Sequence, residues 1–201
     1  SEQGATQLAN TLKIQLIKTP ITALFKQLKT HLTASEADQE TISMPLQNLQ
    51  ARLRALILMY HSNVQNALLL SCGNKSELAM GYCTLYGDLA GAIAPIADLT
   101  KTQVYELAQC LNQTTERIPK MILERAPSAE LAPHQLELIL RQQTGLNELE
   151  SFTPTPLEKE ISKKIQENEF KRQQSGIILR ISESSFNLDR RYPITYQHID
   201  T

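Results

Sequence analysis

The residues best suited to chemistry lie close together between Leu70 and Gly91. Four of the seven glycines of the chain fall in this stretch, at Gly73, Gly81, Gly87 and Gly91. Glycine is used where a backbone must turn sharply or come close to a ligand. The stretch also passes from an apolar run through a turn into a helix start, and such a helix N-terminus beyond a parallel strand favours phosphate. These residues therefore predict a site for an anionic ligand.

Glu77 and Lys101 are the charged residues expected at this site. Glu77 lies three residues after Asn74, which is the spacing of a capping box. A carboxylate beside a phosphate chain is also what Mg²⁺ uses, since Mg²⁺ takes one or two carboxylates together with phosphate oxygens. The two roles are compatible. Lys101 follows Thr100 in the first turn of a predicted helix, where a cation opposes the helix dipole, so it is either a solvated lysine or a partner for bound phosphate.

Two arginines on a long apolar helix are further candidates. At about 100° per residue, Asn48 and Arg52 share one face of the predicted helix 46–63, while Arg54 points away from that face. The arginines are either charges at the rim of a packed surface or ligands of an anion. The pattern by itself indicates an α/β protein with an anion site.

The elements that must position these residues alternate between strands and helices. Short apolar runs predict strands at residues 14–19 and 67–71. Apolar residues at helical spacing predict helices at 5–12, 21–32, 46–63, 75–82, 100–111, 115–124, 135–143 and 155–168. Thr100 is the expected cap of one of them, and Thr155 opens a capping box before the last. The alternation predicts a parallel sheet with helices on both faces, and since only two strands are clear, part of the sheet is expected outside this sequence.

The composition is that of an ordinary globular protein. The chain has 201 residues, of which 41% are hydrophobic and 20% charged, and its net charge is −1. This length predicts one domain. The near-neutral charge argues against a nucleic-acid binder, which usually shows a basic excess. The three cysteines form no CxxC pair, and the sequence has neither a signal peptide nor an apolar run of about 20 residues, so we expect a cytoplasmic protein without membrane contact.

Short sequence blocks occur along almost the whole chain in a recognisable order. They are Asn48-Leu49-Gln50-Ala51-Arg52-Leu53-Arg54, Gly73-Asn74-Lys75-Ser76-Glu77, Gly81-Tyr82-Cys83-Thr84-Leu85-Tyr86-Gly87-Asp88 and further blocks at 98–102, 127–131, 169–173 and 190–194. Together they resemble the synthetase domain of the NAD⁺ synthetase family, in its glutamine-dependent branch. The part from Gly73 to Asp88 is the most specific.

The resemblance implies an ATP-pyrophosphatase-type ligase with a Rossmann-like, adenine nucleotide alpha-hydrolase-like fold. Such an enzyme uses ATP and Mg²⁺ to adenylate the nicotinate carboxylate of deamido-NAD⁺, and ammonia then displaces AMP to give the amide. The family also implies a homodimer, for which the helix 46–63 is a reasonable interface.

The resemblance further implies a role for each matching residue. The residues implied to bind ATP are Arg54, Cys72, Lys101 and Ser128. The residues implied to bind deamido-NAD⁺ are Asn48, Glu77, Asp88 and Lys171. Glu77 is also implied as a ligand of Mg²⁺, and no residue is assigned a catalytic role.

Departures from the family pattern affect this interpretation. The SGGxDS loop that surrounds the pyrophosphate of ATP, with its metal-binding aspartate, would lie before Ser1. Cys72 stands where the family usually has threonine, so a hydroxyl donor is replaced by a weak S–H donor. A family loop expected after Gln135 is not in the sequence. We therefore expect residues 1–201 to be one synthetase domain, incomplete at its N-terminus and inactive alone, within a larger enzyme whose glutaminase domain supplies ammonia.

Two other functions fit parts of the pattern. A related ATP pyrophosphatase, such as a GMP or asparagine synthetase, would share the SGGxDS loop but not the block that ends at Asp88. A non-catalytic nucleotide-binding or dimerisation remnant would be favoured if the SGGxDS loop were truly absent.

Overall fold

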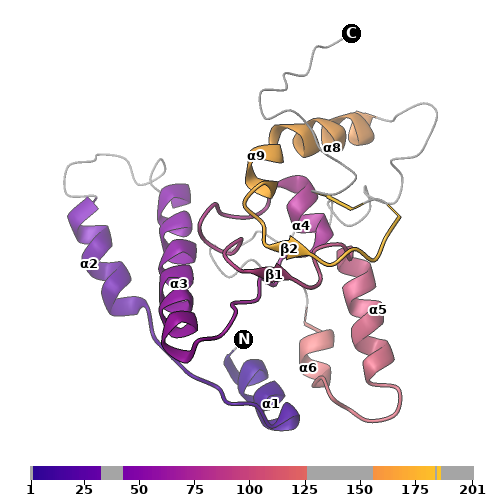
Figure 1. The fold of residues 1–201 in the computed structure, drawn as a ribbon, viewed down its shortest axis with the longest axis horizontal. Coiled ribbons are helices and arrows are strands. Elements are labelled where there is room, and N and C mark those ends of the chain that lie inside the picture. Colours follow the sequence, from indigo (N-terminus) through magenta and orange to yellow (C-terminus); the bar gives the residue numbers. More distant parts are fainter. Residues whose placement is uncertain (1, 33–42, 126–155, 184, 187–201) are drawn as a thin grey trace.

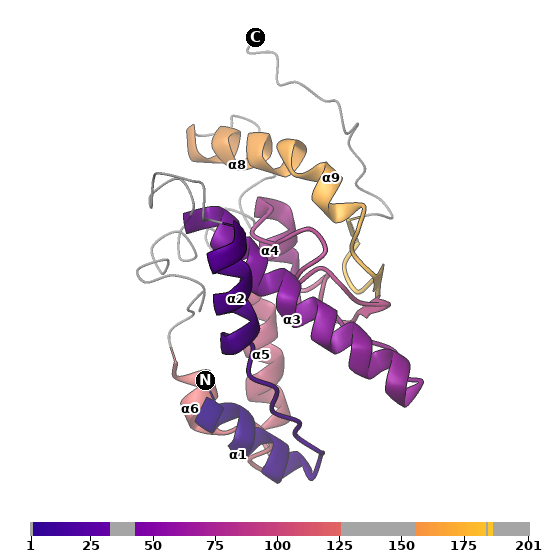
Figure 2. The same ribbon diagram turned by 90° about the vertical axis from the view of Figure 1, so that its left-hand side faces the viewer.

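The structure is a computed structural model, and it describes residues 2–32, 43–125, 156–183 and 185–186 (Figure 1). Along the chain the elements are α1 (Glu2–Leu12), α2 (Thr22–Leu32), α3 (Ser43–Gln65), α4 (Lys75–Met80), β1 (Ile93–Ala94), α5 (Lys101–Leu111), α6 (Lys120–Leu123), α8 (Pro156–Glu167), α9 (Glu169–Arg172) and β2 (Ile177–Ile178). In Figure 1 the two strands lie near the centre, between α3 and α5, and both Figure 1 and Figure 2 place α8 and α9 across one end. None of the helices in these ranges combines the length and apolar character that a membrane span requires.

The sheet is small, and all of its described pairings are parallel. β1 pairs with β2 in a register that places Ile93 opposite Ile177. On its other side β1 forms a single parallel bridge between Ile93 and Leu70. The predicted parallel sheet is therefore present, but the predicted strand 67–71 is reduced to this bridge, and β1 and β2 were not predicted.

The prediction of a strand at residues 14–19 is wrong. The N–H of Ile14 donates to the Ala9 carbonyl at 3.0 Å and closes the end of α1, after which the chain runs as an irregular connection to α2. Ile14, Leu16 and Ile17 are 59%, 41% and 48% exposed. Their apolar spacing suits a strand, but a strand needs a partner for its backbone hydrogen bonds, and the described residues supply none here.

Most of the predicted helices are confirmed. α2, α4, α5 and α8 occupy their predicted ranges closely, and α3 begins three residues earlier than predicted, at Ser43. The predicted cap of α5 is also confirmed, because the Thr100 side chain accepts the N–H of Gln103. The predicted helix 135–143 and the predicted cap at Thr155 lie outside the described residues.

The predicted helix 115–124 is largely wrong, since only α6 forms within it. The reason is the side chain of Asn112, whose Oδ1 accepts the N–H groups of Arg117 and Ile118, both at 2.9 Å. These bonds close residues 112–118 into a loop, and the helix begins only after it, at Lys120.

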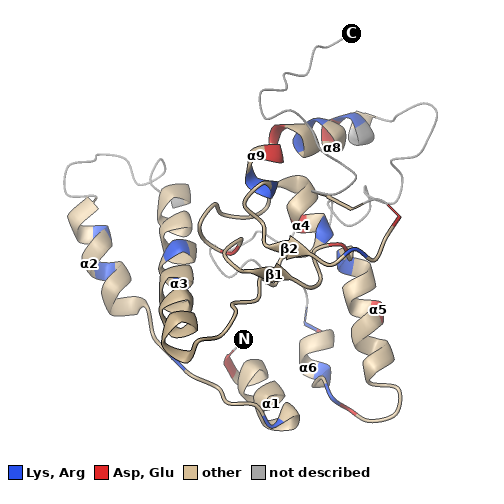
Figure 3. Cartoon of the chain, viewed as in Figure 1, with Lys and Arg blue, Asp and Glu red and all other residues tan. Residues whose placement is uncertain are grey.

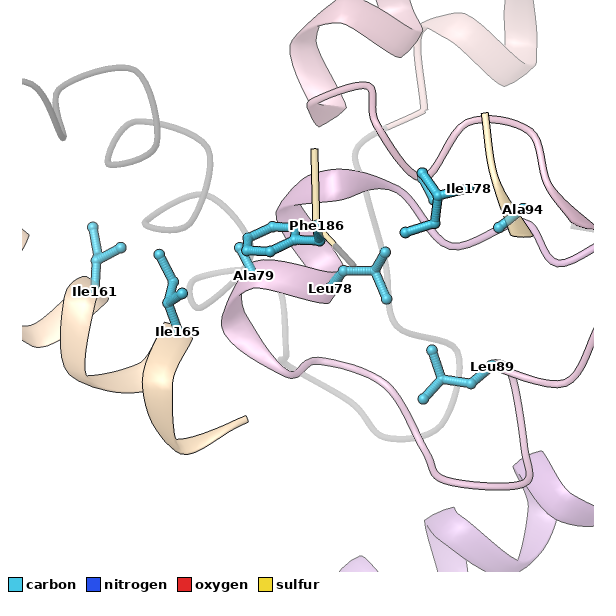
Figure 4. Close-up of a cluster of buried hydrophobic side chains, with 9 residues drawn as sticks. Leu78, Ala79, Leu89, Ala94, Ile161, Ile165, Ile178 and Phe186 are labelled. Atoms are coloured by element: carbon cyan, nitrogen blue, oxygen red, sulfur yellow. The ribbon is translucent and has the colours of Figure 1, made fainter. Parts of the chain in front are cut away.

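The hydrophobic core forms where α4 and α8 pack over the sheet (Figure 4). Its buried members are Leu78, Ala79, Leu89, Ala94, Ala97, Ile161, Ile165, Ile178 and Phe186. Full burial of a large apolar side chain contributes about 1.5–3 kcal/mol, so this cluster is a major source of stability for the described part of the fold.

A buried ion pair joins the C-terminal elements to α4. The side chains of Arg172 and Glu169 are 0% and 1% exposed, and they lie 2.8 Å apart. The guanidinium also lies 4.7 Å from the centre of the Phe186 ring. It donates in addition to three backbone carbonyls, those of Leu78, Ala79 and Ile165. A buried charge is tolerated only when it is paired and hydrogen-bonded, so these contacts specify how α8 and α9 pack on α4.

An open groove of about 520 Å³ lies between the connection 15–21, α3 and residues 67–69. The sheet edge beside it is apolar, with Leu68 and Leu70 69% and 53% exposed. The backbone groups before and after Leu70 already bond to the β1 side, so the N–H and carbonyl of Leu70 point away from β1. An edge with unpaired N–H and carbonyl groups is a template for pairing with another strand, and the described residues do not pair this edge.

Candidate functional site

The end of the strand-like segment at Leu70 leads through a turn into α4, whose first turn is fixed by its cap. Asn74 Oδ1 accepts the N–H of Glu77 at 3.0 Å, and the Glu77 carboxylate accepts the N–H of Asn74 at 3.2 Å. The predicted capping box is therefore confirmed. Gly91 is required beside this turn, because a Cβ there would come within 2.7 Å of the Ser71 nitrogen.

The N-terminus of α5 lies beside that of α4. The N–H of Lys75 donates to the Leu99 carbonyl at 2.8 Å, and the N–H of Lys101 donates to the Ser76 hydroxyl at 3.1 Å. Lys101 Nζ lies 3.5 Å from Glu77 Oε1, and the two side chains are 27% and 34% exposed. Figure 3 shows acidic and basic residues meeting where these two helices begin. The structure thus brings Glu77 and Lys101 together as one accessible charged pair.

A hydrogen-bonded loop connects α3 to Asp88. The Thr84 hydroxyl donates to Asn48 Oδ1 at 2.8 Å, and the Thr84 N–H donates to Asp88 Oδ1 at 2.7 Å. Arg52 Nε donates to the Leu85 carbonyl at 3.1 Å in the same loop. Asn48 and Arg52 therefore share a face of α3, as predicted. Sequence reasoning missed Thr84, which links two of the predicted ligand residues.

Lys171 lies at the other end of α4. Its Nζ donates to the carbonyl of Gly81 at 2.6 Å. Gly81 has the left-handed φ of 66° and ends α4, which turns the chain toward Tyr82. The position of Lys171 follows from the buried Arg172 beside it, which fixes α9 against α4.

Three of the predicted ligand residues shift the pKa values of Tyr82 and Cys83, which lie in the turn after α4. Burial raises the pKa of the Cys83 thiol to about 12, the negative charge of Asp88 adds to this rise, and Lys171 opposes it. Burial likewise raises the pKa of Tyr82, with smaller contributions from Glu77 and Asp88. Hydrogen bonds place all three residues at this turn: the Glu77 carbonyl accepts the Tyr82 N–H at 2.9 Å, Asp88 accepts the Thr84 N–H, and Lys171 donates to Gly81. Cys83 stays protonated at neutral pH and is no nucleophile.

The other residues predicted to bind ATP are Arg54, Cys72 and Ser128, and in the described structure Arg54 and Cys72 do not join the pair of Glu77 and Lys101. Arg54 is exposed on α3 and lines the groove rather than the turn at α4. Cys72 is a free, exposed cysteine between Ser71 and the cap of α4. Ser128 lies outside the described residues.

Sequence reasoning placed Asp98 in the block 98–102 but gave it no role, and the structure shows that it is 1% exposed. Its Oδ1 accepts Lys75 Nζ at 2.9 Å and the Ser182 hydroxyl at 2.8 Å. Its Oδ2 accepts the N–H groups of Ile181 and Ser182 at 2.7 and 2.6 Å. Burial acts to raise the pKa of Asp98, but these N–H groups and the Lys75 ammonium outweigh it and lower the pKa to about 2. The block alone does not indicate this role, because the side chains that Asp98 contacts lie far away in the sequence.

A complete metal site is not formed by the described side chains, in which no group of three or more His, Cys, Asp and Glu residues is arranged to hold an ion. Glu77 offers one carboxylate, with one oxygen in the capping box and the other near Lys101. It fits Mg²⁺ as a single protein ligand beside phosphate oxygens.

The sequence matches known proteins over most of its length. The family model for NAD synthase matches residues 1–149. The chain belongs to the NAD synthase family. The glutamine-dependent NAD(+) synthetase of Aquifex aeolicus is 37% identical over 215 residues, which cover 97% of this chain and 37% of that relative. The chain therefore spans much less than half the length of this curated NAD(+) synthetase.

Solved structures of NAD⁺ synthetases share its fold. The glutamine-dependent NAD⁺ synthetase of Acinetobacter baumannii, in complex with ADP, has a TM-score of 0.56 and 33% identity, covering 96% of this chain and 37% of that chain. The enzyme of Cytophaga hutchinsonii has a TM-score of 0.74 at 23% identity over 96% of this chain and 36% of that chain, and this likeness concerns the fold alone. The mixed α/β fold with a small parallel sheet is thus that of NAD synthetases.

Proposed function

We propose that this chain is the synthetase part of an enzyme that converts deamido-NAD⁺ to NAD⁺ with ATP and glutamine-derived ammonia, through an acyl-adenylate. The observation that carries the proposal is the pair of Glu77 and Lys101 at two adjoining helix N-termini beyond the end of a parallel strand. Such an arrangement suits a phosphate chain. Membership of the NAD synthase family supports the same reaction.

On the ATP side, the residues act by placement and charge. A carboxylate is a poor electrophile, so it must first be activated, and stabilising the phosphate charge is the main task of the protein. Lys101 would neutralise phosphate oxygens at the start of α5. Glu77 would hold Mg²⁺, which supplies further neutralisation when bound. Cys72 would contact ATP mainly through its backbone, since its S–H is a weak donor.

On the dinucleotide side, Asp88 and Lys171 are the proposed contacts with deamido-NAD⁺. Asp88 is exposed while its Oδ1 is held by Thr84, so its direction is fixed. An ammonium has three donors, so Lys171 can bond the Gly81 carbonyl and still contact an anionic ligand. Asn48 contributes by holding Thr84 as well as by any direct contact.

We also propose that the groove beside Leu70 receives a further parallel strand of the protein, which carries the SGGxDS loop. The proposal is supported by the apolar walls of the groove and by the uncovered backbone of Leu70. Arg54 lines this groove, which accounts for its predicted contact with ATP once the loop is in place. The contact of Ser128 with ATP, the glutaminase domain, the homodimer and the cytoplasmic location stay predictions.

The experiment that tests the function is ligand-induced stabilisation of the whole protein. We expect deamido-NAD⁺ to raise the melting temperature, since a ligand that binds only the folded state stabilises it. The substitution Lys171→Ala should reduce this rise to roughly half or less, because it removes a cationic contact. Lys163→Ala is the matched control, since Lys163 is 53% exposed on α8 and pairs only weakly with Glu167 at 4.0 Å.

Three outcomes would contradict the proposal in different ways. A melting temperature unaffected by deamido-NAD⁺ and by ATP with Mg²⁺ would leave a non-catalytic remnant. Stabilisation by ATP with Mg²⁺ alone would favour a related ATP pyrophosphatase with another substrate. An equal rise in wild type and Lys171→Ala would remove Lys171 from the site.

A further inference from the structure

We propose that Asp98 is a positioning residue for the phosphate site formed by Glu77 and Lys101. Its side chain is fully buried, so it does not reach the ligand. It acts instead by fixing the starts of α4 and α5 to each other and to the segment after β2. This inference rests on the proposed function, because the site that Asp98 would position is the proposed ATP site.

Asp98 is the meeting point of three separate parts of the chain. Lys75 is the first residue of α4, and its ammonium bonds both Asp98 at 2.9 Å and the Ser182 hydroxyl at 2.7 Å. Ser182 follows β2 and reaches both carboxylate oxygens of Asp98. Asp98 itself lies two residues before the cap of α5. No one of these segments can shift without breaking a hydrogen bond to a charged group.

The same helix starts carry the site residues. Glu77 is two residues beyond Lys75, and Lys101 is three residues beyond Asp98. Two further hydrogen bonds join the same helix starts: the N–H of Lys75 donates to the Leu99 carbonyl, and the N–H of Lys101 donates to the Ser76 hydroxyl. The 3.5 Å separation of the Glu77 and Lys101 side chains depends on this spacing. A binding site needs its groups held within roughly 0.5 Å, so a small shift of either helix would weaken it.

Stability alone does not explain why a full charge pair is buried here. Burying a carboxylate and an ammonium carries a desolvation cost, and an apolar pair of similar volume is often as stable. The chain offers a comparison in Glu169, a second buried acid, which pairs with Arg172 at the far end of α4. The Glu169 carboxylate accepts from Arg172 in α9 and from Gln173 just after it, and these contacts do not reach α5. Asp98 differs in joining both helices that carry the site.

The test uses the whole protein with ATP and Mg²⁺. The variants Asp98→Asn, Ser182→Ala and Glu169→Gln are compared by melting temperature, by the Kd of ATP from calorimetry, and by the KM values of ATP and deamido-NAD⁺. We expect Asp98→Asn to raise the Kd and KM of ATP about tenfold, the lower end of the cost of losing a supporting partner behind a binding site, with a smaller effect on the KM of deamido-NAD⁺. Glu169→Gln should lower the melting temperature without changing the Kd of ATP.

A double variant distinguishes two effects of Asp98→Asn: misplacement of the site residues, and the loss of stability from removing the charge that pairs with Lys75. Lys75→Met combined with Asp98→Asn removes both charges, so the melting temperature should recover relative to Asp98→Asn. The Kd of ATP should stay raised, because the connection from α4 to Asp98 is still missing. Ser182→Ala removes only the hydroxyl that bonds Lys75 and Asp98, and it should raise the Kd of ATP about threefold, in line with the modest net contribution of a hydrogen bond. If Asp98→Asn does not fold, the Kd of ATP for Ser182→Ala decides whether the inference holds.

Two results would overturn the inference while leaving the proposed function intact. One is wild-type ATP affinity in folded Asp98→Asn or Ser182→Ala. The other is recovery of both melting temperature and ATP affinity in the double variant. If the wild-type protein itself bound no ATP, the proposed function would fail first, and this inference with it.

Discussion

Glu77 caps the start of α4 and also pairs with Lys101, and one substitution separates these two roles. Glutamine also completes a capping box, so Glu77→Gln should change the free energy of unfolding by less than about 1 kcal/mol. It removes the charge that faces Lys101, and amide formation should fall by about 100-fold or more. Urea unfolding and steady-state turnover of the whole protein measure the two effects.

Asn74→Ala is the matched control for this prediction. It removes the cap and leaves the Glu77 charge, so it should cost about 1 kcal/mol of stability. Full turnover in Glu77→Gln would show that the carboxylate is a cap and nothing more.

The acid stability of the protein should depend on Asp98. Its pKa is lowered from 3.8 to about 2, so the ionised group stabilises the fold at pH values above about 4. This stabilisation is lost as the pH falls through 2, and it amounts to something on the order of 2 kcal/mol. We expect the free energy of unfolding in urea to decline between pH 4 and pH 2. The same curve for Asp98→Asn should be flatter, and parallel curves would contradict the assignment.

Among the single residues of the site, the sequence could predict those with a local partner. The capping box of Asn74 and Glu77 needs only a spacing of three, and the shared face of Asn48 and Arg52 needs only the helical period. Asp98 could not be predicted, because its partners lie 23 and 84 residues away. Long-range contacts of this kind leave no periodic signal.

At the scale of elements, the end of α4 depends on a glycine that cannot be replaced freely. Gly81 has a φ of 66°, and a Cβ there would collide with the side chain of Asn168. Gly81→Ala should therefore destabilise the protein by about 1–3 kcal/mol and displace α9, which Lys171 ties to the Gly81 carbonyl. Gly73→Ala is the control, since its Cβ would meet only Ser71 Oγ at 3.8 Å. Equal melting temperatures for the two variants would contradict this explanation.

The helices were predictable and the strands were not, for a physical reason. α3 and α5 carry several turns of apolar spacing, and α5 also has a local cap at Thr100. These signals do not depend on knowledge of the fold. β1 and β2 have two residues each, which is too short for any alternation to show. At residues 14–19 a strand was predicted but is not formed. Their pattern suits a strand, but no described strand lies beside them.

At the scale of the whole molecule, the proposed extra strand makes a measurable prediction. In the whole protein, the N–H of Leu70 should be protected from hydrogen exchange because it would bond to the added strand. Ser71 is an internal reference, since its N–H already bonds to Ile93 at 2.9 Å. Native-state exchange followed by NMR should show the two amides slowed to a similar degree. Fast exchange at Leu70 beside slow exchange at Ser71 would show an open edge, and protection that disappears on dilution would indicate a second copy instead.

The buried guanidinium of Arg172 has a consequence for how the two ends of α4 behave. Releasing α9 would withdraw the Arg172 guanidinium from the carbonyls of Leu78, Ala79 and Ile165 and leave these acceptors without this donor. We therefore expect α4, α8 and α9 to open and close as one cooperative unit. Glu77 and Lys171 belong to opposite ends of that unit and to different proposed ligands. A ligand that holds one end should therefore slow the hydrogen exchange of backbone amides at the other end as well, because both ends open together.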